Sequence, residues 1–331
     1  MTQFVTTVCL ALLAADPHPM AAPGVTSLTN SDVEYSVQKE PTFLLERAGV
    51  KAVIVTNEAV DTKQLPGHRA GYNGVASLTH KKRAENLFVP TIAGLNFEHI
   101  HDGTMAVSKE KFEPRKWPME LRRINRFTVE LYQSPTPNWK LESCGRYEIL
   151  RDGAIKYTFE CIPRADLFHN KTIGLFWASY IHAPESRWIH FRGRRRGSID
   201  PSRWIMGVTP SHGVDSTHPP STWQHKLDID PKFPLTLVNH PSKFEYTSPW
   251  YYGVSHGMAY VQMFRKRDQI WLAQSPTGGG VTNPAWDFQW FIPDYKVGEA
   301  YGFKMRAAYL PYESRDQIIK ATKLHRDALE R

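Results

Sequence analysis

The sequence contains few cysteines and no long apolar runs. It has three cysteines in 331 residues, and no apolar stretch after the N-terminus reaches the roughly 18 residues that a membrane-spanning helix needs. An internal transmembrane helix is therefore excluded. Hydrophobic residues make up 41% and charged residues 22% of the chain, close to the average for globular proteins. This composition excludes disorder over most of the length.

Several catalytic motifs are also absent. The run Gly278–Gly280 lacks the Lys-Ser/Thr pair of a phosphate-binding loop. No G-x-S-x-G segment is present, so the nucleophile elbow of an α/β-hydrolase is excluded. A cupin site is set aside as well, because no carboxylate follows the H-x-H pair His99 and His101 at about four residues and the second cupin motif is missing.

Aromatic residues, proline and glycine are plentiful. The chain has 10 Trp, 14 Tyr, 16 Phe, 24 Pro and 21 Gly. This mixture favours many short strands joined by turns. The net charge of +8 favours an anionic partner, which could be an acidic polysaccharide, a nucleic acid or a membrane. The alternative is a charge bias that only keeps the protein soluble.

The first residues suggest an exported protein. Phe4–Ala15 is an apolar run of 12 residues, which suits the apolar part of a signal peptide and is too short to span a membrane. Leu13–Ala15 offers a small-residue cleavage site, although no Lys or Arg precedes the run. We therefore expect a signal peptide and leader over residues 1–22 and a secreted or periplasmic location. The alternative is a buried N-terminal strand.

The two cysteines outside this leader lie on either side of a predicted hairpin. Asp152-Gly153 is typical of a two-residue turn between strands. Such a turn pairs residues whose numbers sum to 305, which places Cys144 opposite Cys161 at a pair whose side chains are close. A cross-strand disulfide is then feasible and would fit an oxidising compartment. The alternative is two free thiols.

The fold class expected from these patterns is mainly β, a large antiparallel β-sandwich with a short C-terminal helix. Strand-like segments recur along the chain, including residues 51–56, 126–133, 172–181, 259–264 and 301–310. We expect an N-terminal extension over 23–44, one sandwich domain over 45–312 and a helix over 313–331. Ser314 and Gln317 match a capping box at the start of that helix. Its apolar stripe is Ile318, Ala321, Leu324, Ala328 and Leu329.

Histidines are the main candidates for chemistry. His99 and His101 are two apart in a strand-like segment, so both side chains should lie on one face. Histidine titrates near neutral pH and serves as a general acid or base. The acid–base candidates are His99, His101, His182, His212, His256 and the hydroxyl of Tyr252. A divalent metal ion is the one cofactor that the residues suggest, with the candidate ligands His99, His101, His182 and His218. The alternative is that these are ordinary polar loop residues.

Arginines and aromatics supply candidate binding groups. Arg192–Gly197 is the densest basic segment, and a guanidinium binds a carboxylate through two parallel hydrogen bonds. Arg69, Arg192 and Arg194 are the candidates for that role. Sugar rings stack on the faces of aromatic side chains, and Asp and Gln bond the sugar hydroxyls. The segment over residues 283–290 combines both kinds of residue, and its candidates are Trp286, Asp287, Gln289 and Trp290. The alternatives are a solvated loop for the arginines and the sandwich core for the tryptophans.

Five segments together resemble the galactose-mutarotase-like β-supersandwich group. They are GHRAGYNGVASLTH, NLFVPTIAGLNFEHIHDG, FWASYIHAPESRWIHFRG, SPWYYGVSHGMAYVQMF and NPAWDFQWF, and the resemblance covers roughly residues 45–312. It implies large antiparallel sheets whose concave face binds carbohydrate. The group includes aldose epimerases, polysaccharide-lyase domains and related hydrolases. Its catalytic His and late Glu have no defined position here, so no catalytic role is transferred.

The leading functional hypothesis is a secreted enzyme acting on an acidic sugar or polysaccharide, as a lyase that works by β-elimination. Histidine or tyrosine would move the protons, and arginine would hold the carboxylate. A second hypothesis is a glycoside hydrolase or sugar epimerase, with Glu98, Asp102, Glu185, Asp215 and Asp287 as available carboxylates. A third is a non-catalytic carbohydrate-binding module. A nucleic-acid partner is not expected, because no recognised nucleic-acid module surrounds the basic segment.

Overall fold

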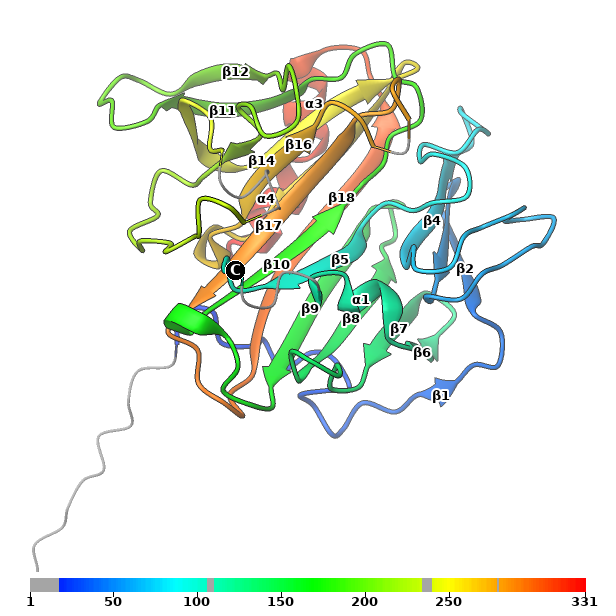
Figure 1. The fold of residues 1–331 in the computed structure, drawn as a ribbon. Helices are drawn as coiled ribbons and strands as arrows, with labels where there is room; N and C mark the ends of the chain where they lie inside the picture. The colour runs from blue at the N-terminus through cyan, green and yellow to red at the C-terminus, as the bar shows by residue number, and fades with distance from the viewer. Residues whose placement is uncertain (1–17, 106–109, 234–239, 279) are drawn as a thin grey trace, which may run out of the picture.

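The computed structural model describes residues 18–105, 110–233, 240–278 and 280–331, which form three antiparallel sheets (Figure 1). The largest sheet has ten strands in the order β1 (Ser36–Val37), β6 (Glu120–Asn125), β7 (Thr128–Gln133), β8 (Leu141–Ile149), β9 (Ile155–Pro163), β18 (Tyr301–Pro311), β15 (Met258–Phe264), β14 (Phe244–Ser255), β11 (Ile189–Arg195) and β12 (Arg203–Gly207). The second has five strands in the order β13 (Thr217–His218), β16 (Trp271–Ser275), β17 (Ala285–Pro293), β10 (Thr172–Ala178) and β5 (Asn96–His101). The third contains β2 (Thr42–Arg47), β3 (Val50–Val55) and β4 (Gly74–His80).

The ten-stranded and five-stranded sheets pack face to face around an aromatic core. Trp177 of β10 lies 4.8 Å from Phe159 of β9 and 5.0 Å from Phe303 of β18, measured between ring centroids. Trp290 of β17 lies 5.2 Å from the same Phe303. Alternate residues of each strand therefore fill the space between the sheets, as in other sandwiches. The predicted large antiparallel β-sandwich is confirmed.

Two short C-terminal helices cover the other face of the large sheet. The predicted cap is present, because the Ser314 hydroxyl accepts a 3.1 Å hydrogen bond from the amide of Gln317. The predicted single apolar stripe is wrong, because the helix is interrupted at Thr322, between α3 (Arg315–Ala321) and α4 (Lys323–Leu329). Leu324 is consequently 78% exposed, and the residues that face the sheet are Ile318, Thr322, His325 and Leu329. The other helices among the described residues are α1 (Glu113–Lys116) and two single turns, η2 (His169–Lys171) and η3 (Lys266–Asp268).

The predicted hairpin between β8 and β9 forms, but its register differs by one residue. Leu150 closes the turn, donating to Ala154 and accepting from Gly153, so three residues rather than two make the loop. Cys144 then pairs with Glu160, and Cys161 pairs with Ser143. A slip of one residue sends a side chain to the other face of the sheet. The predicted register is therefore wrong, and of the two alternatives the structure has the free thiols, both of them buried.

The N-terminal region packs along the large sheet from His18 onward. Met20 is buried in the main core, and Ala22 donates a 2.9 Å backbone hydrogen bond to Ala300. The carboxylate of Glu160 accepts hydrogen bonds from the amides of Val25 and Thr26 at 2.9 Å. Most of the predicted signal peptide, residues 1–17, lies outside the described residues.

Within the described ranges, no helix is long and apolar enough to cross a membrane.

Candidate functional site

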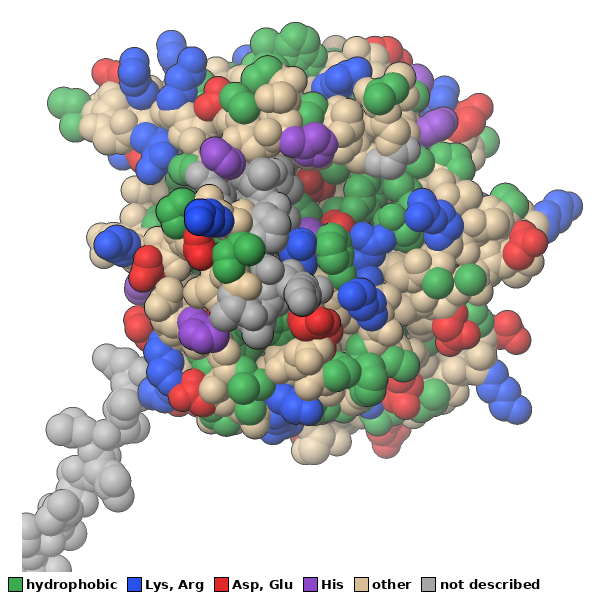
Figure 2. Space-filling model, in the orientation of Figure 1, with side chains coloured by type: hydrophobic (Ala, Val, Ile, Leu, Met, Phe, Trp, Pro, Cys, Tyr) green, Lys and Arg blue, Asp and Glu red, His purple; other side chains and the backbone are tan. Residues whose placement is uncertain are grey.

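The outer face of the five-stranded sheet carries a row of side chains that runs across four strands. His99 of β5 pairs with Phe176 of β10, Phe176 pairs with Gln289 of β17, and Gln289 pairs with Trp271 of β16. All four are buried, although they point away from the sandwich core. Loops lie over them: Phe112 is 4.6 Å from His99, and Trp223 is 5.5 Å from Trp271, between ring centroids. Figure 2 looks onto this side of the molecule and shows acidic, basic and histidine side chains around a hollow near its middle.

A β-bulge brings a carboxylate into this row. The pairing of β5 with β10 shifts between Phe97 and His99, which leaves Glu98 as the extra residue. In a regular strand, neighbouring side chains point to opposite faces, whereas a bulge re-aims one of them. Glu98 is consequently on the same side as His99, with 3.7 Å between its Oε1 and the histidine Nε2.

Two donors hold the carboxylate of Glu98. Arg115 donates from Nη1 to Oε1 at 2.9 Å, and the hydroxyl of Tyr180 donates to Oε2 at 2.9 Å. The guanidinium of Arg115 also lies 3.8 Å above the ring of Tyr72. Burial raises the pKa of Glu98, while the charge of Arg115 and both hydrogen bonds act to lower it. Burial is the larger effect, so the pKa of Glu98 is raised on balance, but by less than it would be without Arg115 and Tyr180.

Asp287 is the second carboxyl group of the site, and its surroundings differ. It accepts a 2.9 Å hydrogen bond from the backbone amide of Ser179, the residue directly before Tyr180. Burial raises the pKa of Asp287 well above its ordinary value, and the charge of Glu98 raises it further. No cation pairs with it among the described residues. The pKa of both carboxyls is raised, and that of Asp287 the more strongly, so Asp287 keeps its proton to a higher pH than Glu98, the order that an acid–base pair needs.

Uncharged polar groups complete the row. Burial lowers the pKa of His99 well below its ordinary value and lowers that of His101 to about 4, so both rings are neutral at physiological pH. Within the described part of the chain, neither ring nitrogen of these histidines has a hydrogen-bond partner, and the same holds for both amide atoms of Gln289. Buried polar groups without partners are unusual in proteins and indicate a place where a ligand could bond.

The structure brings some of the predicted residues together. His99 and His101 of β5 lie on one face of the five-stranded sheet, as their spacing predicts. Asp287 and Gln289 of β17 project from the same face, on the other side of β10. Arg69 is close by, with its guanidinium 5.2 Å from the Tyr72 ring that Arg115 also covers.

Other predicted acid–base residues lie elsewhere. His182 and His212 are exposed in loops, and His212 is hydrogen bonded to Thr277. His256 is 3.1 Å from the exposed carboxylate of Glu185. Tyr252 is buried beneath the C-terminal helices and stacks on His190 at 4.9 Å, on the opposite side of the ten-stranded sheet.

The predicted sugar-stacking tryptophans and carboxylate-binding arginines are also placed differently. Trp286 and Trp290 are fully buried in the core between the sheets, so neither ring offers a face to a sugar. Arg192 donates to the backbone oxygen of Ser202, and Arg194 pairs with Glu245 at 2.7 Å. Both belong to β11, near the edge of the large sheet.

The four histidines proposed as metal ligands do not converge. His218 points to the interior, where its ring is 2.7 Å from the hydroxyl of Ser242 and 4.6 Å from the ring of Phe191. His182 is exposed on a loop. Over the described ranges, no three His, Cys, Asp or Glu side chains are arranged to hold a metal ion. The geometry therefore does not support the predicted metal site.

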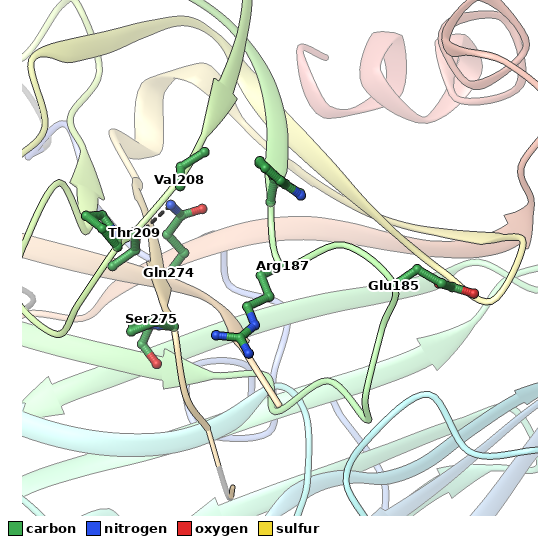
Figure 3. Close-up of a pocket in the computed structure, with 9 residues that line it drawn as sticks. Glu185, Arg187, Val208, Thr209, Gln274 and Ser275 are labelled. Atoms are coloured by element: carbon green, nitrogen blue, oxygen red, sulfur yellow. Dashed lines mark hydrogen bonds between the residues drawn. The ribbon is translucent and has the colours of Figure 1, made fainter. Parts of the chain in front are cut away.

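A separate pocket of about 330 Å³ lies where the ends of β12 and β16 meet (Figure 3). Arg187, Gln274 and Ser275 line it, and Gln274 donates to the hydroxyl of Thr209 at 2.6 Å. Its carboxylate, Glu185, is partly desolvated, but hydrogen bonds from His256 keep its pKa below the ordinary value. This pocket contains no second carboxyl group, so it lacks the acid–base arrangement of Glu98 and Asp287.

Several residues of the site were not among the predicted site residues: Tyr72, Arg115, Phe176, Tyr180 and Trp271. Arg115 belongs to α1, in a segment that reads as a basic loop, and nothing in its spacing points to Glu98. Tyr180 follows β10 directly, and its position beside Asp287 depends on the pairing of β10 with β17.

No family model matches the chain, and no curated protein matches it. Several solved structures have a similar arrangement of strands. A galactose mutarotase-like protein from Lactobacillus casei is 9% identical, with a TM-score of 0.48, 81% of this chain and 99% of that chain being covered. The galactose 1-epimerase from Lactobacillus acidophilus is 8% identical, with a TM-score of 0.41, and 85% and 99% of the two chains are covered. The heparan sulfate lyase HepC from Pedobacter heparinus is 12% identical, with a TM-score of 0.36, and 84% and 37% are covered. The function proposed below rests on the site alone.

Proposed function

We propose that this protein is a carbohydrate-active enzyme in which Glu98 is the general base and Asp287 the general acid. The observation that carries the proposal is the link between the two carboxyl groups. Consecutive residues, Ser179 and Tyr180, bond one carboxyl each, and only Glu98 also pairs with a guanidinium. The pair therefore combines a carboxyl that ionises more readily with one that keeps its proton to a higher pH, as the proposed base and acid require.

A sugar fits the surface around the pair. Aromatic rings alternate with polar groups along the row, since Phe176 and Trp271 are interleaved with His99 and Gln289. The hydroxyls of a sugar would bond the histidine and amide groups that have no partner in the described chain, and its C–H face would stack on Trp271, the aromatic ring of the row that also lines a cavity.

Epimerisation at the anomeric carbon is the reaction that this pair suits best. Glu98 takes the proton of the anomeric hydroxyl while Asp287 gives its proton to the ring oxygen, and the bond from the anomeric carbon to the ring oxygen breaks. Rotation of the open-chain aldehyde and reversal of both proton transfers close the ring with the other anomeric configuration. The reaction needs one acid and one base and no covalent intermediate, which matches the two roles assigned above.

β-Elimination at a uronate is the second candidate, and the position of Arg115 and Tyr180 beside Glu98 favours it. Here a base removes the C5 proton, Arg115 offsets the charge that develops on the substrate carboxylate, and Tyr180 or Asp287 protonates the departing oxygen at C4. The net charge of +8 suits an acidic substrate of this kind.

A panel of sugars and glycans distinguishes these reactions. The purified chain is incubated with neutral aldoses, uronates and uronate-containing polysaccharides while anomeric exchange is followed by NMR, absorbance near 235 nm by spectrophotometry and reducing ends by colorimetry. Exchange of anomers supports the epimerase, and a rise in absorbance supports the lyase. New reducing ends without absorbance would indicate hydrolysis through the same pair. Binding without any turnover would contradict the enzyme proposal and favour a carbohydrate-binding module.

A further inference from the structure

Two cavities lie between the row of side chains and the β11–β12 hairpin, and we treat them as one groove. One part of it, of about 430 Å³, is lined by Trp271, Trp223 and Arg196, and a second part, of about 560 Å³, by Arg195, Arg203 and Lys243. The amide of Arg196 donates to the backbone oxygen of Lys243 at 2.9 Å, so the two parts lie beside one another. We call the surface made by these six residues the arginine groove.

Trp271 connects the arginine groove to the acid–base pair. It lines the groove and also ends the row of side chains, being paired with Gln289, which is two residues from Asp287. Residues two apart on a strand are separated by about 6.6 Å, roughly the length of one sugar unit. Trp271 lies diagonally across the β16–β17 ladder from Asp287, so a chain with one unit at Glu98 and Asp287 would extend toward the groove.

Most of the positive charge of the groove is not paired within the part of the chain that the structure describes. Four basic residues make no ion pair with any described residue: Arg195, Arg196, Arg203 and Lys243. Arg194 also lines the second part of the groove, but it pairs with Glu245 of β14. Asp200 is the one acidic residue that lines it. Figure 2 shows basic side chains concentrated over this hairpin, at the upper left. Such a surface favours a ligand with several negative charges.

The aromatic part of the groove favours a carbohydrate over other polyanions. The rings of Trp223 and Trp271 meet at 89° with centroids 5.5 Å apart, and His225 lies 5.3 Å from Trp223. The indole N–H of Trp271 is buried without an acceptor among the described residues. The perpendicular rings offer a stacking face together with a free donor, which suits a hydroxylated ring.

We propose that the arginine groove binds an anionic carbohydrate chain that extends from the sugar unit held by Glu98 and Asp287. The negative groups are carboxylates or sulfates, and both would be held by Arg196 and the neighbouring cations. The substrate is then an acidic oligosaccharide or polysaccharide rather than a free neutral sugar. This inference rests on the proposed function, because the acid–base pair defines where the chain begins.

Binding is measured by calorimetry on the full chain with polygalacturonate oligosaccharides, dextran sulfate and uncharged dextran. Trp223→Ala and Arg196→Glu are each expected to raise the Kd for the anionic glycans at least tenfold, and uncharged dextran is expected to bind weakly or not at all. The matched controls are Lys320→Glu, an exposed charge on the C-terminal helix, and Trp188→Ala, in the separate pocket. A preference for polygalacturonate identifies carboxylates as the anion, and a preference for dextran sulfate identifies sulfates.

Three results would overturn the inference. One is an unchanged Kd in both groove variants. Another is equal binding of charged and uncharged dextran. The third is binding of a DNA duplex that is as tight as that of the glycans and insensitive to Trp223→Ala, which would make the groove a nucleic-acid site. Glu98→Gln separates this test from the proposed function: it is expected to abolish turnover, while Trp223→Ala and Arg196→Glu still raise the Kd for the anionic glycans when they are made in the Glu98→Gln protein. If the groove variants weaken binding but the unmodified chain turns over no glycan, the proposed enzyme is contradicted. If the unmodified chain turns over a glycan but the groove variants bind it normally, the proposed role of the groove is contradicted.

Discussion

The hydroxyl of Tyr180 donates a 2.9 Å hydrogen bond to the carboxylate of Glu98. This bond helps to keep Glu98 ionised in a buried position, and it depends on a bulge that turns Glu98 toward the outer face of the sheet. The residue before Tyr180 bonds Asp287 through its amide. One short segment therefore positions both carboxyl groups of the candidate site.

Replacing Tyr180 by Phe tests this arrangement. The variant removes one donor to Glu98, so the pKa of Glu98 should rise and the base should be ionised over a narrower pH range. We expect kcat/KM to fall about tenfold to a hundredfold at neutral pH, with the acidic limb of the pH profile moved upward. The matched control is Tyr35→Phe, because the ring of Tyr35 is exposed and lies in the N-terminal region directly before β1. An unchanged acidic limb would show that Tyr180 does not act on the base.

The pH dependence of activity should have two limbs with assigned causes. Activity falls as pH decreases because Glu98 becomes protonated, and it falls as pH increases because Asp287 loses its proton at a raised pKa. Asp287→Asn should lower kcat by about 10²–10⁴-fold and leave the melting temperature close to that of the unmodified chain, since the amide oxygen can still accept from Ser179. Retention of most activity in this variant would exclude Asp287 as the acid.

The thiols of Cys144 and Cys161 should be protected from alkylation in the folded protein and should not form a disulfide. Cys144 and Cys161 are buried on opposite faces of the sheet, and burial raises the pKa of both. We expect no alkylation of either thiol by iodoacetamide in the folded protein and alkylation of both in denaturant without reductant. A reducing agent should leave the melting temperature unchanged. A mass consistent with one intramolecular disulfide after denaturation would contradict the register described above.

Acid should destabilise the fold through its buried histidines. Burial lowers the pKa of His218 from 6.5 to about 3, so below pH 6.5 the unfolded chain takes up a proton that the folded chain does not. The free energy of unfolding is highest above pH 6.5 with respect to this group, and it falls as pH decreases toward 3, by about 2 kcal/mol at pH 5. The free energy of unfolding, measured with urea at pH 7 and at pH 5, should fall by about 2 kcal/mol less in His218→Gln than in the unmodified chain. An equal loss in both proteins would exclude His218 as a cause.

The sequence predicted the architecture better than the site. Alternating apolar residues fix which face of a strand is buried, so the sandwich and the shared face of His99 and His101 could be predicted. The bulge at Glu98 inserts one extra residue into β5, and the three-residue loop at Arg151–Gly153 shifts the pairing of β8 with β9 by one residue. No local sequence pattern distinguishes either feature from regular pairing. The first moved Glu98 into the site, and the second separated the two cysteines.

Long-range pairing accounts for the remaining differences. Tyr252 and Trp290 have the residue types of a sugar site, yet the order of strands places one under the C-terminal helices and the other in the core. Arg115 and Glu98 are 17 residues apart, and only the fold of α1 over β5 brings them to 2.9 Å. Residue type and local spacing contain no information on such contacts.

Anomeric exchange in Glu98→Gln tests the central claim most directly. The rate constant is measured by NMR exchange spectroscopy on the sugar that the unmodified chain turns over fastest, with circular dichroism to show that the variant is folded. We predict that the exchange rate falls at least a hundredfold, to near the uncatalysed rate, while the far-ultraviolet spectrum is unchanged. A folded Glu98→Gln protein that exchanges anomers at the unmodified rate would contradict the assignment of Glu98 as the base and, with it, the proposed acid–base pair.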